Sequence, residues 1–304
     1  MEIITGQIAI MFMLIALGFQ LYRVGFITDA GTKQMSDLVL YVANPILIAR
    51  ALMTDFDSEL LRGGLWAALL AAVLLGVSIV LARLCCRDSD AAREAISRFA
   101  VTFSNAGFVG IPLALSTVGA QGVFYISVMN TVQTFLLWTY GVGLASGDPR
   151  EASPRKVVTN PYIIAMVLGL FCFITSLRPP VLILQALDAL GDLNTGLVML
   201  VLGAYLGECG IRRAFSDVGV AKACLLRLVA MPLLAAALVR AVGPLAELPE
   251  AVCLTTVMFQ AMPVAAVTSL FAHAYGRGED FGTSAVALST MLSLVTLPLM
   301  LSLC

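Results

Sequence analysis

The chain has 304 residues, of which 60% are hydrophobic and only 12% are charged, and its formal net charge is −1. Soluble domains carry about 25% charged residues, so this composition cannot cover the water-facing surface that a soluble protein of this length needs. A soluble enzyme, a nucleic-acid-binding protein and a secreted scaffold are therefore excluded. The net charge indicates nothing about partners.

Ten apolar segments follow one another along the chain, and each is long enough to cross a bilayer as a helix. They lie at 4–22, 35–53, 63–84, 95–117, 121–145, 158–176, 181–207, 219–242, 250–274 and 281–303. Helices are expected because lipid offers no partner for backbone polar groups. The first segment lacks the basic start of a signal peptide and is expected to be a retained span. The seven cysteines form no C-x-x-C pair, which favours small apolar fillers over a disulfide framework.

The most polar stretch of the chain, 146–156, separates the fifth span from the sixth. It predicts a first five-helix unit at 1–148, a cytoplasmic linker at 149–157 and a second five-helix unit at 158–304. Fourteen of the 18 Lys and Arg residues fall in one set of alternate loops. Because basic loops stay in the cytoplasm, a multi-pass protein of the cytoplasmic (inner) membrane with both termini outside is expected.

Two spans carry a proline beside small or polar residues, Pro112 in the fourth and Pro263 in the ninth. The spacing between these two prolines, applied to Asn44-Pro45 in the second span, leads to Thr195-Gly196 in the seventh span. Since each half has five spans, the halves are expected to insert upside-down relative to each other. Interrupted helices at matching places in inverted halves indicate the binding site of a secondary transporter.

The chemistry expected at such breaks favours an anion. A proline in a helix frees a carbonyl group, and Gly107 and Gly110 allow the backbone to unwind. The N-termini of the half-helices then attract negative charge. The sequence therefore predicts an all-α membrane protein with ten transmembrane helices in two inverted five-helix repeats, whose broken helices four and nine cross.

Several stretches together resemble the auxin efflux carrier family, which includes plant auxin exporters and bacterial organic-anion carriers. They are Tyr41–Pro45, Asn105–Leu113, Asn160-Pro161-Tyr162, Leu202–Leu206, Arg227-Leu228-Val229 with Pro232, Ala261-Met262-Pro263, and Leu288–Ser293 with Leu297-Pro298. The resemblance implies a fold like that of sodium/proton antiporters and bile-acid symporters. It also implies a scaffold of spans 1, 2, 6 and 7, which can support a homodimer, and a transport domain of spans 3–5 and 8–10 that moves like an elevator.

The resemblance also implies a substrate-binding role for particular residues. Asn105, Pro112 and Pro263 match positions at the substrate carboxylate of the plant carriers. Tyr162 stands where those carriers have an asparagine, a change that bears on substrate choice. Span seven has Gly196 where many bacterial members have proline.

Other polar residues in the spans have two interpretations each. Asn105 and Gln260 can donate to a substrate carboxylate or satisfy the carbonyls of their own broken helices. Asn44 can touch substrate, although an asparagine satisfied within a kink is favoured. The polar residues of spans five and ten can line the cavity or join helices, and joining helices is the commoner role. These residues are Asn130, Gln133, Thr134, Ser289, Thr290 and Ser293.

Two basic residues are candidates of lower rank. Arg227 can meet an anion, but a long side chain that snorkels to the inner interface is favoured. His273 is the only histidine, and an interfacial position is favoured over a proton relay. No metal site and no catalytic constellation are expected.

The middle parts of spans four, five, nine and ten contain no Asp or Glu. The chain thus lacks the acidic pair of a sodium/proton antiporter, although coupling to Na⁺ through carbonyl and hydroxyl groups, or to H⁺, stays open. The prediction is a secondary carrier, by symport or uniport, of a small mono- or dicarboxylate. The alternatives are a sodium-coupled bile-acid-type symporter and a non-transporting membrane sensor, with a membrane-embedded enzyme third.

Overall fold

The computed structural model describes residues 2–152, 155, 158–208 and 217–302, with side chains from Ile10 onward. The first half contains α1 (Glu2–Arg23), α2 (Asp29–Leu38), η1 (Val39–Ala43), α3 (Asn44–Leu52), α4 (Ser58–Cys85), α5 (Ala91–Thr102), η2 (Ala106–Gly110), α6 (Ile111–Thr117), α7 (Ala120–Leu136), η3 (Leu137–Gly141), α8 (Val142–Ser146) and η4 (Pro149–Glu151). The second half contains α10 (Pro161–Thr175), α11 (Val181–Glu208), α13 (Val218–Leu225), η5 (Leu226–Ala230), α14 (Met231–Ala246), α15 (Glu250–Ala261), α16 (Val267–Ala274) and α17 (Glu279–Leu301).

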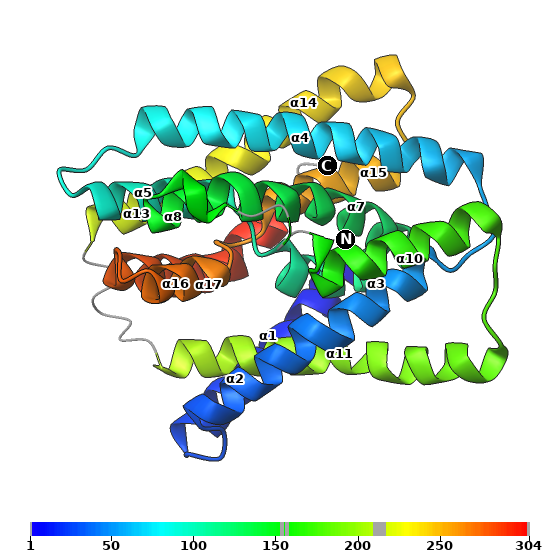
Figure 1. The fold of residues 1–304 in the computed structure, drawn as a ribbon, viewed down its shortest axis with the longest axis horizontal. Helices are drawn as coiled ribbons and strands as arrows, with labels where there is room; N and C mark the ends of the chain where they lie inside the picture. The colour runs from blue at the N-terminus through cyan, green and yellow to red at the C-terminus, as the bar shows by residue number, and fades with distance from the viewer. Residues whose placement is uncertain (1, 153–154, 156–157, 209–216, 303–304) are drawn as a thin grey trace.

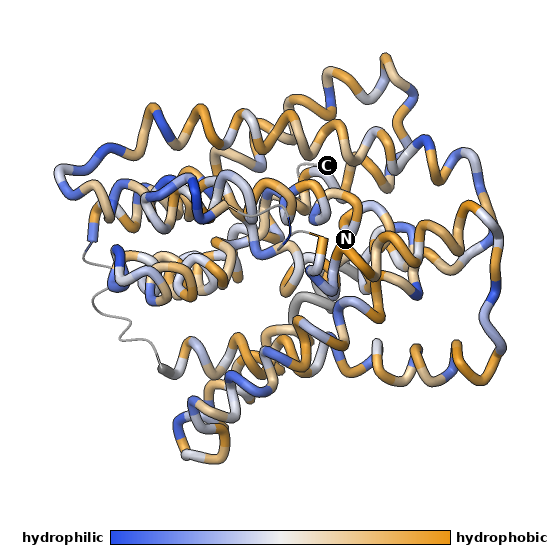
Figure 2. The backbone as a smooth tube through the Cα atoms, in the orientation of Figure 1, coloured by the Kyte–Doolittle hydropathy of each residue, from blue (hydrophilic) through white to orange (hydrophobic). Residues whose placement is uncertain are grey.

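Every apolar segment predicted from the sequence coincides with helical structure in the described residues. Five helices are long and apolar enough to cross a membrane, and four further apolar helices have 10–17 residues. Figure 2 shows apolar colour along most of the long helices and polar colour mainly at their ends and in the loops. Exposed rows such as Leu65, Leu69 and Val73 on α4 present an apolar surface suited to lipid. The chain is therefore a multi-pass membrane protein.

Prolines inside these helices are accommodated by widened turns. A π-helical segment ends two residues before Pro45, before Pro112 and before Pro232, at η1, η2 and η5 respectively. Proline has no N–H group and its ring crowds the carbonyl four residues earlier. A π-bulge relieves that crowding while the helix continues, so none of these three prolines breaks its helix.

The helices form two packed groups. In the first group, α1 packs along α11, and α3 packs against both α10 and α11. In the second group, α4 packs on α5 and α7, α15 packs on α7, α14 and α17, and α13 and α16 pack on α17. Figure 1 shows α4 along one edge of the molecule and α11 along the opposite edge. Contacts of α7 with α3 and α10 join the groups.

Glycines let α1 and α11 approach until their backbones touch. A Cβ atom on Gly203 would lie 2.1 Å from the Ile15 carbonyl oxygen, and one on Gly18 would lie 2.3 Å from the Leu200 carbonyl oxygen. Gly203 and Gly207 form a G-x-x-x-G pair on α11, and Gly207 packs on the ring of Tyr22. Small residues at this spacing are the usual means of close helix packing in membranes.

We expect Gly203→Ala to lower the melting temperature of the purified protein by several degrees, because the new methyl group must push the two backbones apart. Gly196→Ala on the same helix is the matched control, since a Cβ there meets nothing within 4 Å. Equal melting temperatures for the two variants would contradict the close backbone contact.

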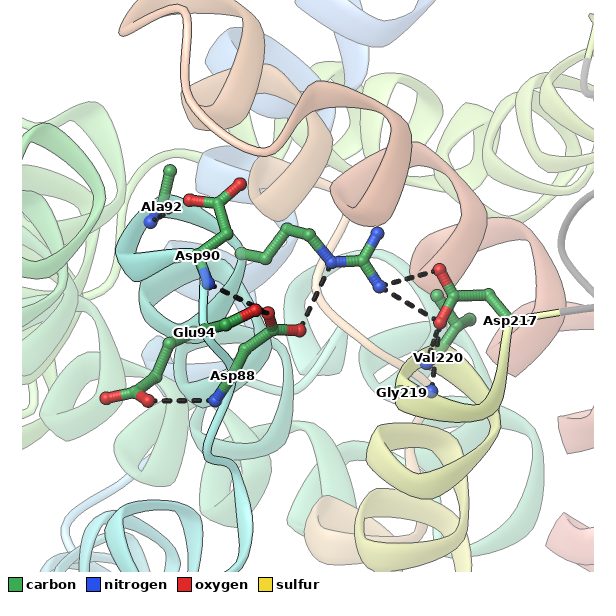
Figure 3. A network of polar contacts seen from close by, with 9 residues as sticks. Asp88, Asp90, Ala92, Glu94, Asp217, Gly219 and Val220 are labelled. Carbon is green, nitrogen blue, oxygen red and sulfur yellow. Dashed lines mark hydrogen bonds and ion pairs between the residues drawn. The ribbon is translucent and has the colours of Figure 1, made fainter.

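Arg93 ties together three elements at one end of the second group. Its guanidinium lies between Asp88, before α5, and Asp217, the N-cap of α13, with contacts of 3.2 and 2.8 Å (Figure 3). It also stacks over the ring of Phe281 in α17. Burial raises the pKa of Asp217, but hydrogen bonds from Arg93 and from the amides of α13 outweigh burial and hold that pKa below its ordinary value. The contact therefore joins α5, α13 and α17 at neutral pH.

Candidate functional site

The two interrupted helices cross and pair at their breaks. The first break separates α5 from η2 at residues 103–105, and the second separates α15 from α16 around Pro263. Ser104 and Val264 form an antiparallel bridge. The amide of Asn105 donates to the Pro263 carbonyl at 2.8 Å, and the amide of Ala265 donates to the Phe103 carbonyl at 3.0 Å. Two extended segments thus hold each other in register.

This geometry corrects the expectation that the first helix breaks at Pro112. The first helix breaks at Ser104-Asn105, whereas Pro112 lies inside α6 beyond the π-bulge of η2. Pro263 does lie at the crossing. Residues that pair across the bridge are 160 positions apart in the sequence, so Pro112 and Pro263 are not counterparts at the crossing.

Arg227 is fully buried beside the crossing, which shows that the favoured interpretation of a snorkelling side chain was wrong. It donates to the carbonyl oxygens of Val101, Phe259, Gln260 and Met262 at 2.7 to 3.3 Å, and to the side-chain oxygen of Gln260 at 2.9 Å. These carbonyls belong to the last turns of α5 and α15, or follow directly. Carbonyls at helix C-termini lack partners within the helix and carry the negative end of its dipole. One guanidinium therefore satisfies both half-helix ends.

Arg227 also fixes the orientation of the Gln260 side chain. A guanidinium can only donate hydrogen bonds, so the amide oxygen of Gln260 must face it. The Gln260 Nε2 group is then left as a buried donor without a partner among the described residues.

Gln133 of α7 holds the first break through hydrogen bonds to Ser104. Its Oε1 accepts from the amide and hydroxyl of Ser104 at 2.9 and 2.8 Å, and its Nε2 donates to the Ser104 carbonyl at 2.8 Å. The same Nε2 lies 3.2 Å from Oδ1 of Asn130. Ser289 of α17 supports the second break, since its hydroxyl accepts from the Val264 amide at 3.1 Å. Both breaks are thus held by side chains of neighbouring helices.

Polar side chains from both groups of helices meet beside the first break. Asn44, at the start of α3, donates through Nδ2 to the Gly107 carbonyl at 2.9 Å. A Cβ atom on Gly107 would lie 3.5 Å from Nδ2 of Asn130. The hydroxyl of Tyr162 in α10 faces Asn130 and Ser127. Five predicted residues are therefore brought together, namely Asn44, Asn105, Gly107, Asn130 and Tyr162.

Two buried amide donors at the crossing have no partner among the described residues, Nδ2 of Asn105 and Nε2 of Gln260. The hydroxyls of Tyr162 and Ser127 lie close to each other and to Asn130. Leaving a buried polar group unpaired costs about 1 to 3 kcal/mol, so the two free donors at one crossing are a candidate binding site for an acceptor-rich molecule. A carboxylate accepts hydrogen bonds and donates none.

Gly110 and Pro112 are closely packed, and His273 lies on α16 outside the crossing segments. A Cβ atom on Gly110 would lie 2.8 Å from Ile126 and 3.5 Å from Met262, so this glycine lets η2 approach α7 and the second break. Pro112 is buried in α6. His273 is about half exposed, bonds to the Ser269 carbonyl on its own helix and lies 3.8 Å from Glu279.

A cavity of about 620 Å³ lies away from these residues, where α3 ends and α4 and α7 begin. It is lined by Ala51, Thr54, Asp55, Phe56, Asp57, Ser58, Leu60, Ala120 and Gln121. None of the predicted site residues contributes to it. Because two aspartates line it, and only Asp55 has an arginine partner among the described residues, it is a poor site for an anion.

Comparison with known proteins settles the family. The family described as membrane transport protein matches the chain twice, over residues 3–154 and over residues 150–301. The chain belongs to this family. The resemblance to auxin efflux carriers that the motifs indicate is thereby confirmed, and the two matches meet within the polar stretch 146–156.

Relatives of this membrane transport protein span almost the whole chain. A protein of Methanothermobacter thermautotrophicus named "Uncharacterized transporter" is 26% identical over 300 residues, which are 97% of this chain and 96% of its own. A protein of Rhizobium meliloti named "Putative malonate transporter" is 21% identical over 304 residues, which are 96% of this chain and 93% of its own. The family membership makes a small-molecule substrate and a lipid environment part of the protein's function.

Proposed function

We propose that the protein is a secondary transporter that moves a small organic anion, a mono- or dicarboxylate, across the cytoplasmic membrane. The observation that carries the proposal is the two unpaired buried donors at the crossing, Nδ2 of Asn105 and Nε2 of Gln260. The buried charge of Arg227 beside them favours a negatively charged ligand. The name of the Rhizobium meliloti relative agrees with a dicarboxylate.

The two packed groups of helices support an elevator mechanism. We assign α1, α2, α3, α10 and α11 to a scaffold, which includes the surface for a possible homodimer. The elements α4–α8 and α13–α17 form the moving group. The candidate site lies where the groups meet, because Asn44 and Tyr162 belong to the scaffold and Gly107 and Asn130 to the moving group. Alternating access requires a site at such a boundary.

The double family match supports two repeats of five spans each. An odd number of spans per repeat supports an inverted arrangement, and the basic loops support an orientation with both termini outside. The carbonyl oxygens freed at the half-helix C-termini, which could hold Na⁺ in a coupled carrier, already accept hydrogen bonds from Arg227. This contact favours uniport or proton coupling over sodium symport, and it counts against the sodium-coupled bile-acid-type alternative.

The test is electrophysiology on proteoliposomes adsorbed to a solid-supported membrane, challenged with a panel of carboxylates with and without Na⁺ and a pH gradient. We expect a carboxylate-dependent current, and we expect Asn105→Ala to weaken the apparent affinity about ten- to a hundred-fold, because a buried donor to a charged acceptor is lost.

Gln121→Ala is the matched control, because Gln121 lines the cavity remote from the crossing. Its current should equal that of the unmodified protein. If instead Gln121→Ala abolishes the current and Asn105→Ala does not, the substrate binds in the remote cavity. Radiolabelled uptake replaces the current where transport is electroneutral, and a folded protein that binds carboxylates but never moves them would be a sensor.

A further inference from the structure

Asn194 lies in the middle of α11 and is fully buried, and neither atom of its side-chain amide has a hydrogen-bond partner in the part of the chain that the structure describes. A buried amide normally forms several hydrogen bonds, and an unpaired one is costly. A fully unpaired asparagine inside a packed helix bundle therefore indicates a missing partner.

The packing of α11 on α3 shows what Asn194 faces. The two helices run antiparallel, since Arg50 pairs with Asp188 at 2.7 Å while a Cβ atom on Gly191 would lie 3.5 Å from the Leu47 side chain. Three residues back along α3 thus correspond to three residues forward along α11. The next turn places Asn44 opposite Asn194.

Asn44 has the complementary unsatisfied group. Its Nδ2 donates to the Gly107 carbonyl, so its Oδ1 is directed elsewhere and has no partner among the described residues. On this register the two residues occupy facing turns of α3 and α11, and no hydrogen bond joins their amides among the described residues. The pair offers one free acceptor on Asn44 and, on Asn194, both a donor and an acceptor.

We propose that Asn194 and Asn44 form a second subsite of the substrate site, which holds a group that both donates and accepts hydrogen bonds. A hydroxyl group or a protonated carboxyl group has this chemistry. The inference rests on the proposed transport of organic anions and extends it, because Asn194 becomes a specificity-determining residue. The preferred substrate is a short acid with a second polar group, rather than an unsubstituted monocarboxylate.

The two subsites are close enough for one small molecule. Asn44 contacts Gly107, which follows Asn105 by two residues, and two residues of chain span at most about 7 Å. A carboxylate bound by the free donor of Asn105 can therefore place a hydroxyl group on the next carbon, or a second carboxyl group two carbons away, toward Asn44 and Asn194. The scaffold and the moving group then each hold one end of the substrate.

The experiment compares three acids of equal carbon number, propionate, lactate and malonate, by thermal-shift titration of the full-length protein in detergent. Propionate has no second polar group, lactate has a hydroxyl group and malonate has a second carboxyl group. We expect the unmodified protein to bind lactate or malonate at least about tenfold more tightly than propionate, since one added hydrogen-bonding group contributes a factor of this size. A titration at pH 5 and pH 7 shows whether malonate binds as the monoanion.

Asn194→Leu should remove that preference and leave propionate affinity unchanged within about twofold. The matched control is Gln185→Leu, the same change at an exposed position of α11, which should keep the preference. Without ligand, Asn194→Leu should melt at or above the temperature of the unmodified protein, since it removes an unpaired buried amide.

The outcomes separate the two proposals. If all three acids bind but Asn194→Leu weakens them equally or not at all, the second subsite is wrong and the proposed function stands. A large fall in melting temperature for Asn194→Leu would likewise show a structural role and overturn the inference. If none of the acids shifts the melting of the unmodified protein, the proposed anion site itself fails, together with its second subsite.

Discussion

Arg227→Met should destabilise the protein by several kcal/mol, because each buried carbonyl group left without a partner costs about 1 to 3 kcal/mol. The methionine side chain fills similar space but donates nothing to the four carbonyl oxygens that Arg227 now satisfies. Both half-helices would then end without partners in the protein interior. The measurement is the melting temperature of the purified protein in detergent, and we expect a loss of binding for any carboxylate that the unmodified protein binds.

The melting temperature of Arg227→Lys should lie between those of the unmodified protein and Arg227→Met. An ammonium group keeps the positive charge, but it cannot reach as many carbonyl oxygens as the planar guanidinium group. Arg23→Met makes the same change at an exposed arginine in the last turn of α1, is the matched control, and should melt like the unmodified protein. Wild-type melting of Arg227→Met would mean that the carbonyls at the crossing find other donors, and it would contradict the role given to Arg227 here.

Gln133→Leu is the second substitution for which we expect a large effect. It leaves the amide, the hydroxyl and the carbonyl of Ser104 without partners at the first break. Each unsatisfied buried group costs about 1 to 3 kcal/mol. The backbone at the first break should therefore become locally disordered at a lower temperature than the rest of the protein. We expect a marked fall in melting temperature, together with weakened carboxylate binding measured by thermal-shift titration.

Gln133→Glu tests which of these contacts matters. A carboxylate still accepts from the amide and hydroxyl of Ser104 but cannot donate to its carbonyl, so an intermediate effect is expected. Gln121→Leu makes the same change as Gln133→Leu at the exposed start of α7 and should be neutral. If the Gln133→Leu and Gln121→Leu proteins have the same carboxylate affinity and the same melting temperature, the position of Ser104 does not depend on its hydrogen bonds to Gln133.

The helices themselves could be predicted from the sequence, because lipid leaves an apolar segment no other regular structure. The place of the first break could not. Proline is the marker that the sequence offers, and Pro263 does lie at a break, but Pro112 follows a π-bulge that lets its helix continue. The residues that do break the first helix, Ser104 and Asn105, are polar and stand before the glycines. Their extended backbone depends on a bridge to a segment 160 residues away.

The members of the polar site were partly predictable. Asn44, Asn105, Asn130 and Tyr162 stand out as polar residues in apolar spans, and the structure gathers them. Arg227 was misjudged because the sequence shows how far its side chain can reach but not the carbonyls at α5 and α15 that it meets. Asn194 was missed because nothing in the sequence shows that the antiparallel packing of α3 places it opposite Asn44.

The contacts of Arg227 also determine the electrical balance of a transport cycle. A guanidinium stays protonated at physiological pH, and here it bonds to amide oxygens rather than to a carboxylate. On the proposed mechanism, a crossing that holds a monoanion carries no net charge, whereas the empty crossing carries one positive charge. The membrane potential, about 2.3 kcal/mol per charge for each 100 mV, then acts on the return of the empty carrier. An inside-negative potential draws that empty carrier inward, which drives export of the anion without a coupling ion.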